Sequence, residues 1–475
     1  MRRGVRGEAR TAAQSPRETS MGSGAVGLVL ALILTSVGQV AAPARAIAQV
    51  VEDVDLSTPL SLEELVRIAK QQNFGLQRFR ETSAQARSSR KSTLSGLLPS
   101  LSGSVDYNQS ESRYRDSRVD LTTGEVRTAN RTSSSDSYQL GVGGRLNVID
   151  PAQWYGVAES NRRIVAADYS VEDAEQDLVF LVQSQYYSLI RAQALADVRQ
   201  RSRDLSGEQL ERARALYELG SVARTDVLQA QVSHASAQRE RIAAFNAIEQ
   251  ERANLAVLLS ISLDTPLEIE QPGALPDTSL EFDEAAFVAE GLEHRPDFLR
   301  ARTALEAARI SETAARWRRW PSIGGNYSYG KQEDEIADLF GDFGNEYRWA
   351  FGLALDVPIF DGFSTKAAIE QAEASRRQEE RTLEELRLQV SLDVRQALLD
   401  LTDAVEGIRA AREGVGFAEE SVRLQQALYE SGGGTLLEWN NAQVELTRAR
   451  NDLVETEINL RQAHSALEKA RGRAN

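Results

Sequence analysis

The stretch that decides the fold is LPSLSG at Leu98–Gly103, because it returns later in the chain as WPSIGG at Trp320–Gly325. Upstream of both copies, Asn73–Leu76 and Arg295–Phe298 match at the same offset. Self-similarity over so long an interval is the signature of a duplicated unit. The sequence therefore predicts two copies of one structural module in tandem.

A second pair of segments extends the repeat toward the C-terminus. LYELG at Leu216–Gly220 recurs as LYESG at Leu428–Gly432. This offset is slightly shorter than the first, and the difference lies between Pro99 and Asp150. A unit of this length is too large for one turn of a solenoid, so each half is expected to be a complete module. The predicted modules are residues 49–270 and residues 271–475.

Each half contains two predicted strands of about ten residues, within residues 99–149 in the first half and 321–358 in the second. After Pro99, apolar side chains such as Leu101 and Val105 alternate with polar ones, and Trp349 and Phe351 alternate with small residues. A period of two is typical of strands with one apolar and one polar face. A polar loop joins the two strands of each pair.

The strands are flanked by proline-free helical segments of unusual length. In the first half, Gln153 to Leu219 would form roughly 100 Å of helix at 1.5 Å per residue. The return segment Thr225–Ser260 and the leading segment Leu62–Leu94 together match that length, so we expect them to stack end to end beside the long helix. The second half repeats the leading, long and return helices at Asp283–Trp317, Phe363–Glu430 and Thr435–Ala470.

Residues 1–48 have the order of charge and hydropathy of a secretory signal peptide. Arginines precede the apolar run Ala25–Val37, which is too short to span a bilayer. Small-residue sites of the A-x-A type follow at Ala44–Ala46 and Ala46–Ala48. The segment is therefore predicted to direct export, with Met1 or Met21 as the start, and a short buried helix is the weaker alternative.

Composition excludes several classes of function. The chain has no cysteine and only three histidines, which leaves no thiol nucleophile and little material for a metal cage. Its net charge of −15 argues against nucleic-acid binding. Acidic runs such as Glu333–Glu335 have no histidine or metal-spaced partner, so we expect no enzymatic activity, no cofactor and no metal site.

The strand pattern is that of an outer-membrane barrel wall, apolar toward lipid and polar toward a lumen. In a soluble protein the apolar face would instead cover a core, and the pattern alone leaves that alternative open. Four strands cannot close, and an open edge in hydrocarbon leaves backbone groups unpaired. Three copies would pool twelve strands into a closed barrel, which predicts a homotrimer.

The order of these features resembles the TolC-type outer membrane efflux protein family over most of the chain after the signal peptide. The resemblance also rests on PIFDG at Pro358–Gly362 and on the turn segment that runs from Tyr217 through Gly220 to Ala230. It implies a mainly helical chain with a transmembrane β part. The implied assembly is a trimeric 12-stranded outer-membrane β-barrel that continues into a periplasmic α-helical barrel.

The family further implies a function and partners. The expected function is the outer membrane channel, or exit duct, of a tripartite efflux or type I secretion system in a Gram-negative bacterium. The implied partners are outer membrane lipid, a periplasmic membrane-fusion adaptor and an inner-membrane pump of RND, ABC or MFS type. The alternative from another class is a periplasmic coiled-coil scaffold or adaptor that never inserts into a membrane.

The resemblance also implies a periplasmic gate where the helices turn, farthest from the membrane. Tyr429 is expected to hydrogen-bond near Asp226 or Arg224, and Glu438 is expected to line an acidic constriction. A glutamate early in a helix is also common on solvated surfaces, and that alternative stays open. The expected gate residues are Tyr217, Arg224, Asp226, Tyr429, Glu438 and Asn441.

Two further groups complete the predicted sites. The turns present small side chains to an adaptor, at Gly220, Ser221, Val222, Ala223, Gly432, Gly433 and Gly434. Aromatic residues near the strand ends are expected to form one membrane-interface belt, made of Trp154, Trp317, Trp320, Trp349, Phe360 and Phe363. For Trp154 and Trp317, packing between strands and helices is an equal alternative.

Overall fold

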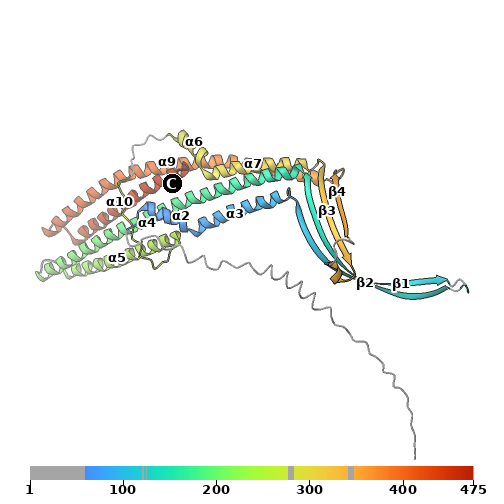
Figure 1. Ribbon diagram of the computed structural model, residues 1–475. Helices are drawn as coiled ribbons and strands as arrows, with labels where there is room; N and C mark the ends of the chain where they lie inside the picture. The colour runs from blue at the N-terminus through green and yellow to red at the C-terminus, as the bar shows by residue number, and fades with distance from the viewer. Residues whose placement is uncertain are drawn as a thin grey trace, which may run out of the picture. The chain divides into compact units, whose positions relative to one another are not determined.

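The computed structural model describes residues 59–119, 122, 124, 126–275, 283–340 and 347–473. The predicted signal peptide lies outside the described residues. The elements, labelled in Figure 1, are α2 (Leu62–Gln72), α3 (Phe74–Ser95), β1 (Ser100–Val119), β2 (Val126–Ile149), α4 (Pro151–Glu218), α5 (Arg224–Leu259), α6 (Glu284–His294), α7 (Pro296–Trp317), β3 (Ser322–Glu333), α8 (Ile336–Leu339), β4 (Tyr347–Asp356), α9 (Ser364–Glu430) and α10 (Leu436–Ala470).

Two long helices, α4 with 68 residues and α9 with 67, organise the helical part. In Figure 1, α5 returns beside α4, and α10 returns beside α9. Helix α4 also contacts α2 and α3 of its own half, and α7 and α10 of the other half. The two halves therefore pack against each other along α4. No helix in the described part of the chain is long and apolar enough to cross a bilayer.

The leading helix of the first half is interrupted, which corrects the prediction of one continuous helix. Helix α2 ends and α3 begins at Asn73. The Asn73 side chain accepts a hydrogen bond from the Leu76 amide at 2.9 Å and donates one to the Leu258 carbonyl at 2.9 Å. Asparagine favours such capping positions because its short side chain reaches backbone groups. The same residue thus caps α3 and joins it to the end of α5.

The second half has an equivalent break at Arg295, so the prediction of a single helix there is also wrong. Pro296 is the first residue of α7, where its missing N–H costs nothing, and it disfavours helical geometry in the residue before it. The Arg295 guanidinium contacts Asp297 at 2.7 Å and Asp393 of α9 at 2.8 Å. This ion-paired arginine holds the break against the long helix.

Apolar faces of neighbouring helices form the core. Between α9 and α10, Val394 and Leu460 are buried within a continuous cluster. Leu189 of α4 and Leu255 of α5 are fully buried in the first half. Burial of one such side chain contributes about 1.5–3 kcal/mol. The helical part is therefore stabilised within the single chain.

The four strands form one antiparallel sheet in the order β1-β2-β3-β4. The side chains of Phe351, Leu353 and Leu355 on β4 are 64%, 67% and 65% exposed. Alternation along the strand places all three on one face. No described part of the chain covers them, so the apolar face of the sheet does not cover a core within one copy.

The first hairpin is much longer than predicted. Strands β1 and β2 have 20 and 24 residues, whereas β3 and β4 have 12 and 10. Pairing between β1 and β2 continues from Asn108–Ser137 to Val119–Val126, beyond the last β2–β3 pair at Tyr138 and Glu333. We call this two-stranded part, residues 108–119 and 126–137, the ribbon. It was predicted as a loop because both of its faces are polar and show no hydropathy period.

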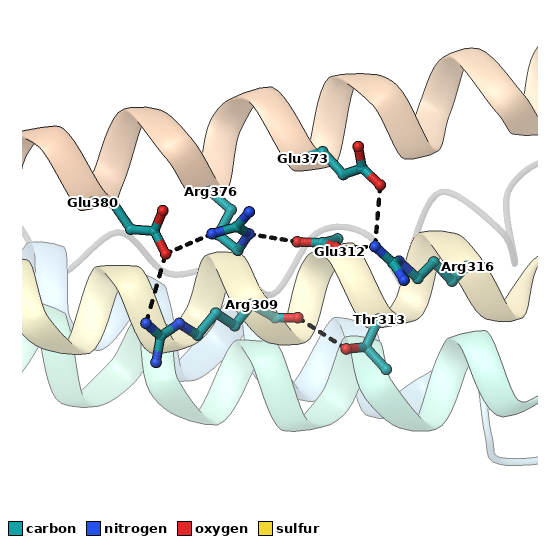
Figure 2. Close-up of polar contacts among 7 residues, drawn as sticks. All are labelled: Arg309, Glu312, Thr313, Arg316, Glu373, Arg376 and Glu380. Carbon is teal, nitrogen blue, oxygen red and sulfur yellow. Dashed lines mark hydrogen bonds and ion pairs between the residues drawn. The ribbon is translucent and has the colours of Figure 1, made fainter.

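Figure 2 shows a chain of alternating charges that joins α7 to α9. The Arg376 guanidinium of α9 donates to Glu312 of α7 at 2.7 Å and to Glu380 of its own helix. Further members of this network are Arg309, Arg316 and Glu373. The Glu312 side chain is only 12% exposed, so its charge depends on these partners.

The first half contains an equivalent ion pair. Arg87 of α3 contacts Asp168 of α4 at 2.8 Å. Arg87 corresponds to Arg309, and Asp168 corresponds to Glu380, at the two repeat offsets of the sequence. Both leading helices are therefore tied to their long helix by the same pair of charges at the same level.

We expect Arg376→Met to lower the melting temperature of the detergent-solubilised protein, because Glu312 and Glu380 lose their shared cation. The loss should shrink in molar salt, which screens the wild-type network. Arg381→Met is the matched control in the same helix, since its side chain is 81% exposed and forms its ion pair with Glu384, three residues along the same helix. Equal losses in the two variants would contradict a role for the network.

Candidate functional site

The turns that end α4 and α9 have the same geometry. Gly220 and Gly432 adopt positive φ values of 76° and 75°, a conformation that glycine enters without steric cost. The amide after each glycine donates back to the last helical turn, Ser221 to the Leu216 carbonyl and Gly433 to the Leu428 carbonyl, both at 2.9 Å. This is the Schellman arrangement, which explains why the Tyr-x-x-Gly pattern occurs twice.

Helix α10 begins with a reciprocal cap. The Glu438 carboxylate accepts hydrogen bonds from the Thr435 amide and hydroxyl, both at 2.9 Å, and the Glu438 amide donates to the Thr435 hydroxyl at 3.3 Å. These bonds lower the pKa of Glu438 below its ordinary value of 4.5. Glu438 is exposed, so it presents a negative charge at the start of α10.

A small apolar core joins the two turns. It combines Leu210 and Ala213 of α4, Ala230 of α5, Tyr429 of α9, and Leu436 and Trp439 of α10. We call it the tip cluster. Val222 of the first turn and Val227 at the start of α5 pack against it. The hairpin of one half is therefore held to the hairpin of the other by burial of apolar side chains.

The hydrogen bond expected from Tyr429 to Asp226 or Arg224 is not formed. The Tyr429 hydroxyl and the Trp439 indole N–H are both buried without a hydrogen-bond partner among the described residues. The two rings lie 5.5 Å apart between centroids. Burial raises the pKa of Tyr429, and the negative charge of Asp226 raises it further. Tyr429 thus lies close to Asp226 but acts here through packing.

Among the charged and aromatic residues of this site, sequence reasoning missed three. The Arg212 guanidinium of α4 lies 5.5 Å from the Trp439 ring centroid and forms an ion pair with Glu430 of α9. Trp439 itself is 4% exposed. A tryptophan within the first turns of a charged helix was the available signal. Arg212 and Glu430 gave none, because they are far apart in the sequence and typical of a solvated helix face.

The other predicted gate and docking residues lie around the tip cluster. Tyr217 is 45% exposed, and Arg224 and Asn441 are exposed near the starts of α5 and α10. Gly220, Ser221 and Ala223 in the first turn, and Gly432 and Gly433 in the second, are exposed as well. The structure therefore brings the two groups together at one end of the helices.

The aromatic residues predicted to form one belt lie in two separate rows. One row, which we call the lower row, lies where the strands meet the helices. In it the ring centroids of Trp317 and Trp320 are 5.2 Å apart, and those of Phe360 and Phe363 are 5.6 Å apart. Trp154, at the start of α4, is half exposed. Trp349 does not belong to this row.

Trp349 forms part of the upper row. Its partner in the sheet is Tyr329. This pair is seven residue pairs from Ser322 and Asp356, which pair at the end of the sheet next to the helices. That spacing is roughly 23 Å along a strand. Tyr329 stacks on Tyr347, and Tyr107, which is also seven residues from the start of its strand, contacts Tyr138 at 4.9 Å.

Comparison with known proteins decides the family. The family model described as "Outer membrane efflux protein" matches residues 65–260 and 288–473. The chain belongs to the outer membrane efflux protein family. Its members are outer membrane channels, so the protein lies in the outer membrane with a helical extension in the periplasm.

Among the described residues no cluster of histidine and acidic side chains could hold a metal ion.

Relatives within the family differ in their described roles. Outer membrane protein TolC of Vibrio cholerae is 23% identical over 79% of this chain and 84% of its own length. Outer membrane efflux protein BepC of Brucella suis is 26% identical over 80% and 78%. Proteases secretion protein PrtF of Dickeya chrysanthemi is 23% identical over 78% and 81%. These relatives support the channel over the scaffold alternative.

Solved structures agree with the fold. A membrane protein from Pseudomonas aeruginosa superimposes with a TM-score of 0.74 at 22% identity, covering 86% of this chain and 93% of that one. The CmeC outer membrane channel of Campylobacter jejuni gives 0.71 at 18% identity, covering 87% and 86%. The fold of this chain is therefore that of the TolC-like channels, mostly helical with a small sheet.

Proposed function

We propose that three copies of this chain form a closed twelve-stranded barrel in the outer membrane that continues into a periplasmic barrel of helices. The observation that carries this proposal is the uncovered apolar face of the sheet at Phe351, Leu353 and Leu355. Lipid covers such a face, and pooling strands from three copies removes the open edges of β1 and β4. In this assembly the two aromatic rows mark the two membrane interfaces.

Exposed apolar side chains on the helices support the same assembly. On α9, Leu388 and Phe417 are 73% and 76% exposed, and on α5, Val232 and Val257 are 71% and 65% exposed. Large apolar side chains in such number on one chain indicate contact with other chains. We infer that they lie between the modules 49–270 and 271–475 of neighbouring copies.

Native mass spectrometry of the detergent-solubilised protein tests the assembly. We expect three copies, because four strands per copy give an even, closable barrel of twelve. A monomer that retains its full strand content would contradict the proposal, since its two sheet edges would then be stable without partners.

The proposed role is that of an exit duct for an inner-membrane pump, through a periplasmic adaptor. The relatives include proteins named for efflux and one named for protease secretion. The proposed pump is of RND, ABC or MFS type. The small, exposed turns around Gly220 and Gly433 are the proposed adaptor dock, because glycine admits close approach of another helix.

We further infer that the tip cluster keeps the periplasmic entrance closed, and that Glu438 of three copies forms an acidic ring around it. Such a ring attracts divalent cations. Glu438→Gln should therefore reduce block of the channel by divalent cations in planar bilayers. The Thr435 hydrogen bonds lower the pKa of Glu438 below its ordinary value, so the carboxylate is charged at neutral pH and block should weaken as acid protonates it. Unchanged block in the variant would place the ring elsewhere.

A further inference from the structure

The ribbon extends past the part of the sheet that a membrane can cover. It begins one pair beyond Tyr107 and Tyr138, in the upper aromatic row, and continues for twelve residue pairs. At 3.4 Å per residue this is about 40 Å. Its described side chains are almost all exposed, and serine, threonine and charged residues predominate. The ribbon therefore lies in water beyond the outer end of the barrel.

The two faces of the ribbon differ. Strand alternation puts Ser110, Ser112, Ser133 and Ser135 on the face that continues the polar side of the sheet, and the register pairs them directly, Ser110 with Ser135 and Ser112 with Ser133. Arg113 lies on the opposite face, which continues the apolar side. Short neutral side chains thus line the inward face over the first half of the ribbon, whereas Asp116, Arg118 and Arg131 lie farther out on the same face.

Both edges of the ribbon lack a partner. Strand β3 ends at Glu333 and β4 begins at Tyr347, so in the described chain the ribbon residues of β1 and β2 pair only with each other. A free two-stranded ribbon is marginally stable in water, and its unpaired backbone groups are a template for another strand. The ribbon is therefore incomplete in a single copy.

We propose that the three ribbons of the trimer associate with one another above the barrel, with their serine faces turned inward. The inference rests on the proposed trimer, which brings three identical ribbons around one axis. Where β3 and β4 end, β2 of one copy and β1 of the next run antiparallel and have no strand between them. Neutral serine faces approach without repulsion.

The charges at the far end of the inward face are paired within one ribbon. Asp116 lies 3.4 Å from both Arg118 and Arg131, so its charge is already shared by two cations of its own chain. The contact between copies is therefore made by the serine segment, Ser110, Ser112, Ser133 and Ser135. The partner is a second copy of this chain, and the exit of the duct is narrowed by a collar that the barrel itself does not contain.

Three consecutive serines provide a matched test, because the chain has no cysteine of its own. Ser133→Cys and Ser135→Cys place a thiol on the inward face, and Ser134→Cys places one on the outward face. Each variant is oxidised in outer membranes and examined by non-reducing electrophoresis. A disulfide needs Cβ atoms about 3.5–4.5 Å apart, so only adjacent inward faces can form it. Each cysteine can form one disulfide bond, so the expected product is a dimer in which two of the three copies are covalently linked.

We expect dimers from Ser133→Cys and Ser135→Cys to form roughly tenfold faster than from Ser134→Cys, because association raises the effective concentration of the inward thiols. Equal rates in all three variants, faster linking of Ser134→Cys, or no dimer at all would overturn the proposal. Native mass spectrometry of the same unoxidised variants separates this result from the proposed function. Three copies without inward linking reject the collar alone, whereas the absence of a trimer rejects the assembly on which it rests.

Discussion

Leu353→Arg is expected to abolish assembly of the protein in the outer membrane. Leu353 lies on the apolar face of β4, opposite Gly325 and between the two aromatic rows. An arginine on the lipid face near the bilayer midplane costs about 2–4 kcal/mol. A trimer incurs this cost three times, which is comparable with the whole stability of a typical domain. Outer membrane fractions should contain little of the variant by immunoblot.

Ala354→Arg is the matched control for this prediction. Ala354 is the next residue on β4, faces the polar side, and pairs with Gly324, at which an added Cβ would meet no atom within 4 Å. We expect normal amounts of this variant in the outer membrane, because the new guanidinium reaches the water of the lumen. If both variants assemble equally well, the apolar face does not contact lipid.

Much of the fold could be predicted because it depends on local patterns. Proline-free, alanine-rich segments set the long helices to within a few residues, and alternation located the strands. The breaks at Asn73 and Arg295 were missed because their capping partners, such as the Leu258 carbonyl, come from distant parts of the chain. The ribbon was missed for a different reason. Backbone pairing holds it together, and backbone pairing leaves no trace in hydropathy.

The position of the candidate gate could be predicted from the sequence, but the contacts that hold it together could not. The Tyr-x-x-Gly pattern identified both turns, and its glycines have the expected geometry. The contact that joins the turns is a buried apolar cluster in which Leu210 and Ala213 of the first half lie with Trp439 of the second. Only the packing of α4 against α10 brings them together. Sequence reasoning therefore proposed a hydrogen bond where the structure has a buried apolar contact.

Trp439→Ala is expected to open the periplasmic entrance and raise single-channel conductance in planar bilayers. Removing a buried tryptophan ring costs about 3–5 kcal/mol. Since each 1.4 kcal/mol changes an equilibrium tenfold, the ratio of closed to open states should fall by about two to three and a half orders of magnitude. Opening should not require an adaptor, because in the proposed gate the tip cluster is the contact that an adaptor separates.

Two variants control for this effect. Leu437→Ala shortens an apolar side chain in the same turn that is 55% exposed, so conductance should not change. Tyr429→Phe removes only a hydroxyl that has no hydrogen-bond partner in the described structure, so the entrance should stay closed. If Trp439→Ala conducts like the parent while remaining a trimer, the entrance is held by other contacts.

The matched lengths of the helices constrain how this protein can evolve. Helix α4 runs unbroken beside both α3 and α5, and α9 runs unbroken beside both α7 and α10. An insertion of a single residue in α4 would rotate everything beyond it by about 100° and turn its apolar stripe away from its neighbours. Insertions of about seven or about eleven residues bring the stripe back to within about 20°, and each must occur in both halves together. The reach of the duct between two membranes is therefore inherited in discrete steps of about 10 Å or about 16 Å, not residue by residue.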